Sequence, residues 1–81
     1  MDTYTQKAFI ADSLASINYF ARSIGEWRAM IAREKDDVFK QWFSYFCDIE
    51  ETYLEVESER LETLRNELID WERRQRELLL V

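Results

Sequence analysis

The stretch Arg33-Glu34-Lys35-Asp36-Asp37 is the longest uninterrupted run of charged residues, and it separates two segments with helical periodicity. An aspartate can cap a helix there, because its carboxylate accepts hydrogen bonds from the first backbone N–H groups and favours the positive end of the helix dipole. We therefore predict a turn at this stretch. One helix should end near residue 34, and a second should begin at about residue 37.

The segment before the turn has an apolar face in which residues recur at spacings of three and four. Its members are Ile10, Leu14, Ile17, Ala21, Ile24 and Ile31. Arg28 interrupts this row, and Phe9, Phe20 and Trp27 widen the apolar arc to one side. Gly25 favours a break as an alternative, but a glycine within a helix costs only about 1 kcal/mol relative to alanine. We predict one helix over about 3–34.

The segment after the turn contains two apolar series. The first is aromatic and comprises Phe39, Trp42, Phe43, Phe46, Ile49 and Tyr53. The second follows a seven-residue repeat and comprises Leu54, Leu61, Leu64, Leu68, Trp71 and Leu78. The two series differ in phase by about one residue, which indicates either a stutter or a break. We predict one helix over about 37–79, with a three-helix arrangement broken near 50–58 as the alternative.

The composition agrees with an all-α fold in one domain, residues 1–81. The chain has one glycine and no proline, whereas β-rich folds need several turn-forming residues. A domain usually contains about 100–200 residues, so a chain of 81 residues is too short for a second one. We predict a long antiparallel helical hairpin.

Helices of these lengths would leave the end of the second helix overhanging, because each residue adds about 1.5 Å. The overhang would expose apolar residues, and a closed twofold assembly would cover them. We therefore expect a homodimer that forms a four-helix bundle or coiled coil. The predicted dimer seam comprises Leu61, Leu64, Leu68, Trp71 and Leu78.

Several function classes are disfavoured by the composition. The chain has no histidine and one cysteine, Cys47, so it lacks the commonest general base and the ligands of a thiolate zinc site. We expect no enzyme activity, no cofactor and no metal, and we interpret Cys47 as a packing residue. The first residues do not resemble a signal peptide, and no apolar run is as long as a membrane span, which needs about 20 residues. We therefore expect a cytoplasmic protein without membrane contact.

Charge is distributed unevenly along the chain. The net charge is −6, and the segment 34–57 carries eight acidic and two basic residues. An acidic surface repels phosphate, so we expect no direct binding of nucleic acid.

The candidate partner-binding residues are aromatic or acidic. Trp42 and Tyr45 are residue types that dominate protein interfaces. Glu50 and Glu57 fall within the apolar arc, where a carboxylate is costly unless it is paired, and Arg28 and Arg60 are the candidate partners within the chain. The candidates in the acidic segment are Asp36, Asp37 and Asp48.

These features favour a small acidic helical module that binds, sequesters or inhibits a partner protein. The alternative is a nucleic-acid mimic, whose acidic middle segment would block a DNA- or RNA-binding protein. Salt should distinguish the two, because a mimic would lose affinity steeply as salt rises, whereas an aromatic interface would barely change.

Overall fold

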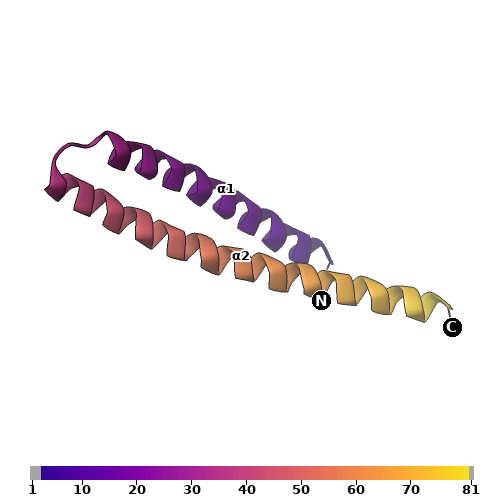
Figure 1. Ribbon diagram of the computed structural model, residues 1–81. Coiled ribbons are helices and arrows are strands. Elements are labelled where there is room, and N and C mark those ends of the chain that lie inside the picture. The colour runs from indigo at the N-terminus through magenta and orange to yellow at the C-terminus, as the bar shows by residue number, and fades with distance from the viewer. Residues whose placement is uncertain (1–2, 81) are drawn as a thin grey trace.

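The computed structural model describes residues 3–80, and over that range the protein consists of two antiparallel α-helices (Figure 1). Helix α1 spans Thr3–Arg33 and helix α2 spans Asp37–Leu80. The predicted all-α hairpin is confirmed. Helix α2 continues through residues 50–58, so the three-helix alternative is not adopted, and α1 continues through Gly25.

The charged turn is held by its own acidic side chains. Asp36 Oδ1 accepts hydrogen bonds from the backbone N–H of Val38 at 2.8 Å and of Phe39 at 3.3 Å. Glu34 Oε1 accepts from the backbone N–H of Lys35 and of Asp36, each at 3.1 Å. Asp36 is therefore the N-cap of α2, whereas the sequence allowed either Asp36 or Asp37, and the turn needs neither glycine nor proline.

The molecule is a thin rod. Its principal extents are 68 × 15 × 14 Å, and its radius of gyration is 18.8 Å, against about 12 Å for a compact chain of this length. The C-terminal part of α2 extends past the start of α1 (Figure 1). The predicted overhang is present, and two helices alone leave most side chains near water.

The two helices meet along a row of residues on each helix, which we call the inner seam. On α1 the row is Gln6, Ile10, Ser13, Ile17, Phe20, Ile24, Trp27 and Ile31. On α2 it is Phe43, Cys47, Glu50, Leu54, Glu57, Leu61, Leu64, Leu68 and Trp71. All are buried or half-buried, and the spacing alternates between three and four without a slip. The expected change of phase near residue 53 is wrong, because the aromatic series combined Phe43 with residues of a neighbouring face.

Polar residues interrupt the inner seam. Gln6 is 3% exposed, and its Nε2 donates to the carbonyl oxygen of Leu64 at 2.9 Å and to Glu67 Oε2 at 3.1 Å. Ser13 is fully buried, yet its Oγ has no hydrogen-bond partner among the described residues. Only Ile24 and Cys47 are buried apolar residues in the described chain. The interior of the hairpin is therefore small for a chain of this length.

The two carboxylates predicted within the apolar arc do lie in the inner seam. Glu50 Oε2 and Glu57 Oε2 are buried and lack hydrogen-bond partners among residues 3–80. Arg60 lies 3.7 Å from Glu57, as expected. Arg28, in contrast, forms its ion pair with Glu51 at 2.6 Å and is largely exposed, so its expected place at the centre of the apolar row is wrong.

Candidate protein-binding surface

A second apolar row runs along the first half of α2, beside the inner seam. Its residues recur at spacings of three and four, which keeps them on one helical face. We call this row the aromatic strip, and its members are Phe39, Trp42, Phe46, Ile49, Tyr53 and Val56. The seven-residue repeat places its centre about 100° around the helix from the inner seam. One helix thus has two seams, and α1 lies over only one of them.

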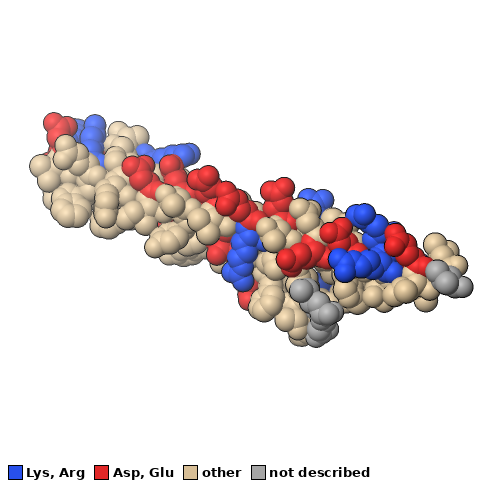
Figure 2. Space-filling view, turned by 90° about the horizontal axis from the view of Figure 1, so that it is seen from below, with Lys and Arg blue, Asp and Glu red and all other residues tan. Residues whose placement is uncertain are grey.

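The aromatic strip is open to solvent. Five of its six residues are 40–56% exposed, and Ile49 is half-buried. Tyr45 and Val38 border the strip and are 58% and 60% exposed. Figure 2 shows a broad uncharged area near the turn end of the molecule, next to a run of acidic side chains. Contiguous exposed apolar surface of this kind marks interaction sites.

One edge of the strip rests on α1 through ring contacts. Phe46 stacks on Trp27 with ring centroids 5.6 Å apart, and Tyr53 stacks on Phe20 at 5.7 Å. Trp42 in turn stacks on Phe46 at 6.2 Å. These contacts fix the rings of the strip before any partner binds, so little side-chain entropy would be lost on binding.

Charges are absent from the aromatic strip and from its outer border. Between residues 38 and 56, the border residues on the side away from the inner seam are Val38, Tyr45 and Thr52, which are uncharged like the strip itself. The exposed acids Asp48 and Glu55 lie about 130° around α2 from the strip. An occupant of the strip would therefore need an apolar surface and no compensating charge.

The predicted partner-binding residues fall in three different places. Trp42 lies in the aromatic strip and Tyr45 borders it, and both side chains are exposed. Glu50 and Glu57 are in the inner seam. The acidic candidates are exposed but dispersed. Asp36 caps α2, Asp37 is its first residue, and Asp48 lies about three turns further along the helix.

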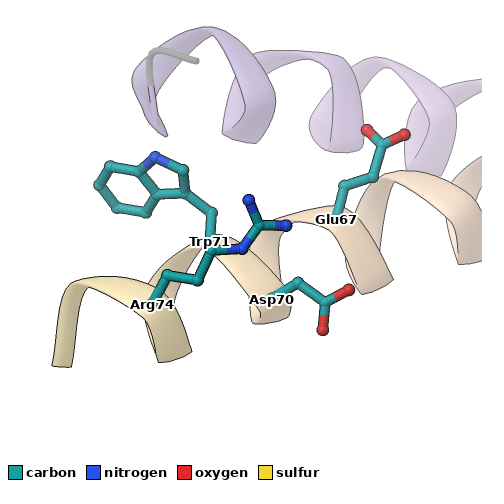
Figure 3. Close-up of a pocket in the computed structure, with 4 residues that line it drawn as sticks. All are labelled: Glu67, Asp70, Trp71 and Arg74. Atoms are coloured by element: carbon teal, nitrogen blue, oxygen red, sulfur yellow. The ribbon is translucent and has the colours of Figure 1, made fainter. Parts of the chain in front are cut away.

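The residues predicted as a dimer seam are mostly engaged within the hairpin. Four of the five lie in the inner seam and are half-buried: Leu61, Leu64, Leu68 and Trp71. The Trp71 side chain points toward the first turn of α1, at a shallow pocket that Glu67, Asp70 and Arg74 also line (Figure 3). Leu78 is 68% exposed on the overhang. Contact of this row with a second chain stays a prediction.

Cys47 lies in the inner seam, about one turn after Phe43, and is 4% exposed. Burial raises the pKa of its thiol, and the nearby Glu51 carboxylate, 3.7 Å from Sγ, adds to the rise. The hydrogen bond and charge of Glu51 also raise the pKa of Arg28. The thiol is thus kept protonated and inaccessible, which matches its interpretation as a packing residue.

Sequence reasoning missed the strip as a separate face and the buried polar residues of α1. Gln6 and Ser13 precede Phe20 and Trp27 at intervals of seven, so they share one side of the helix. Ile49 and Val56 complete the strip at the same spacing as its aromatics. Separating the two rows by heptad position would have found both.

Comparisons of this chain with protein-family models, with curated proteins and with solved structures found no match. Neither α1 nor α2, within residues 3–80, has a stretch apolar enough and long enough to cross a membrane.

Proposed function

We propose that this protein is a protein–protein interaction module that binds a partner protein through the aromatic strip, and thereby sequesters or inhibits it. The observation that supports this most is the strip itself: six apolar residues at coiled-coil spacing, pre-ordered by stacking on α1 and left open to solvent. An apolar helical face that enters the strip would gain the hydrophobic free energy that α1 does not provide.

The strip has the composition of an interface centre. Tryptophan and tyrosine dominate the binding energy of most interfaces. Here Trp42 and Tyr45 both contact the ring of Phe46, and Tyr53 follows Phe46 about two turns further along the strip. Helices that dock on such a row do so through residues at the same three-and-four spacing. We therefore expect the partner to contribute an amphipathic helix.

The test is affinity capture from nuclease-treated lysate of the source cells, with washes at low and high salt. A variant with Trp42→Glu and Val56→Glu changes two exposed strip residues, and a matched control with Gln41→Glu and Asn66→Glu adds the same charge elsewhere on α2. A partner retained by the wild type and control through high salt, but lost by the strip variant, supports the proposal. A partner retained equally by all three proteins contradicts it.

The nucleic-acid mimic is the second candidate, and the run of acidic side chains along the middle of α2 favours it (Figure 2). Its exposed members include Asp48, Glu55, Glu59 and Glu62. Neutral amides at Asp48 and Glu55 should then abolish capture of a nucleic-acid-binding protein, and that capture should fail at high salt. An unchanged, salt-resistant interaction would exclude the mimic.

A further inference from the structure

We infer that a second copy of this chain occupies the aromatic strip when no other protein is bound, with the two α2 helices antiparallel across a twofold axis near residues 47 and 48. The inference rests on the proposed function, in which the strip is the binding surface, and it names the chain that first fills it. It also moves the homodimer contact from the leucines of the second half of α2 to the aromatic first half.

The spacing of the strip is self-complementary. The intervals from Phe39 to Val56 are three, four, three, four and three, so the row is the same when it is followed in either direction. An antiparallel second copy therefore aligns every strip residue with another strip residue. In this alignment each strip residue of one copy faces a strip residue of the other copy. Phe39 faces Val56, Trp42 faces Tyr53 and Phe46 faces Ile49. A twofold contact requires this kind of self-matching patch.

The charges also favour a second copy over a basic partner. The strip and its outer border carry no charge between residues 38 and 56, so pairing two strips buries no ion. Asp48 and Glu55 lie about 130° away on each α2 and would remain in solvent. The buried oxygens of Glu50 and Glu57 are already covered by the hairpin itself, so the second copy adds little to their cost.

The hairpin exposes more surface than a compact chain of the same mass, and a dimer interface would cover part of the excess. The protein exposes 6560 Å², whereas a compact monomer of 9.9 kDa exposes about 5,200 Å². A standard stable interface takes about 800 Å² from each partner, which is less than the difference. Residues 3–80 include only two buried apolar residues, so a second copy would also supply the core that a chain of this size lacks.

The first test is the mass in solution, measured by gel filtration with light scattering at micromolar concentration. We expect the wild type and the Gln41→Glu/Asn66→Glu control at about twice 9.9 kDa, and the Trp42→Glu/Val56→Glu variant at 9.9 kDa with its helical circular dichroism retained. A monomeric wild type, or a strip variant that remains a dimer, overturns the inference. If the strip variant unfolds, Trp42→Ala/Val56→Ala replaces it, with a weakened dimer expected.

The second test concerns direction and needs no disruptive variant. A nitroxide on Thr63→Cys, in a Cys47→Ser background, lies on α2 beyond the strip. At a rise of 1.5 Å per residue, the antiparallel arrangement places the two labels about 45 Å apart. Pulsed electron paramagnetic resonance measures this distance. A separation below about 20 Å would indicate a parallel pair and overturn the inference.

The two proposals fail separately. A monomer that still captures a partner through the strip contradicts the second copy and leaves the proposed function standing. A dimer through the strip whose variants capture partners normally supports the second copy and contradicts the proposed function.

Discussion

The two apolar rows of α2 differ in what they contain and in what covers them. The inner seam lies under α1 although glutamates occupy two of its positions, Glu50 and Glu57. The aromatic strip contains no charged residue, yet five of its six members are 40–56% exposed. The row with the more apolar composition is therefore not the one that closes the hairpin. This difference is the basis for proposing that the strip contacts another chain, whereas the inner seam holds the hairpin closed.

The largest effect should separate the rows by their role in folding. Ile24→Ala removes one of the two apolar side chains that are buried among residues 3–80, and should lower the free energy of unfolding by about 3 kcal/mol. Val56→Ala, in the strip, should cost less than about 1 kcal/mol when measured at low protein concentration, because that side chain is half in water. Urea unfolding gives both values. Equal losses would show that the strip is as much part of the hairpin's core as the inner seam.

A smaller effect should follow from repairing the inner seam. Glu57→Leu removes a carboxylate whose Oε2 is buried and has no hydrogen-bond partner in the described part of the chain, and should raise the free energy of unfolding by about 1–2 kcal/mol. Glu59→Leu, on the exposed face of the same turn, is the matched control and should give no such gain. If Glu57→Leu destabilises the protein, the ion pair with Arg60 has a structural role that its 3.7 Å separation does not suggest.

Ser13→Ala should stabilise the hairpin by about 1 kcal/mol. The change removes a fully buried hydroxyl that has no hydrogen-bond partner within residues 3–80, and it introduces the residue with the best helix propensity. Ser58→Ala is the control, since its exposed Oγ donates to the carbonyl oxygen of Leu54 at 2.8 Å. Thermal unfolding of the two variants compares them. A loss of stability in Ser13→Ala alone would reveal a hydrogen bond that this seam makes in solution.

The smallest effect concerns Cys47 as a probe of the inner seam. Alkylation of the native thiol should be at least about tenfold slower than in urea, because the side chain is buried and its pKa is raised. A raised pKa also means that its contribution to stability is complete below the ordinary thiol pKa and is lost as the pH rises through the raised value. The urea concentration at the unfolding midpoint should therefore decrease as the pH is raised above about 9 in the wild type. In Cys47→Ala it should show no such decrease. Rapid native alkylation would show that the inner seam opens readily.

The parts of the fold that depend on local chemistry could be predicted from the sequence. Asp36 caps α2 because of its own side chain and the adjacent charged residues, and the helical periodicity fixed both helices to within a residue or two. The choice between the two rows of α2 could not be predicted in this way. The choice depends on which face of α2 packs against α1. Gln6 and Trp27 on α1 determine that face through contacts with residues that are distant in the sequence.

The candidate surface was accordingly located only in part. The sequence identified Trp42 and Tyr45 as surface aromatics, and the structure confirms their exposure. It also placed Arg28 in the apolar row, although a long side chain at the edge of a helix pair reaches solvent and an acidic neighbour, here Glu51. Val56 was missed, and Ile49 was grouped with Phe43 of the inner seam, because the strip becomes visible only when the two rows are separated.

In our account, the hairpin buries its aromatic strip against a second copy of the same chain. The most direct measurement is the urea midpoint of the wild-type protein alone across about a hundredfold range of concentration. Folding coupled to pairing of two strips predicts a midpoint that rises steadily with concentration, because mass action favours the assembled state. A midpoint that stays constant over the whole range would contradict the account, since the hairpin would then be fully folded with its strip uncovered.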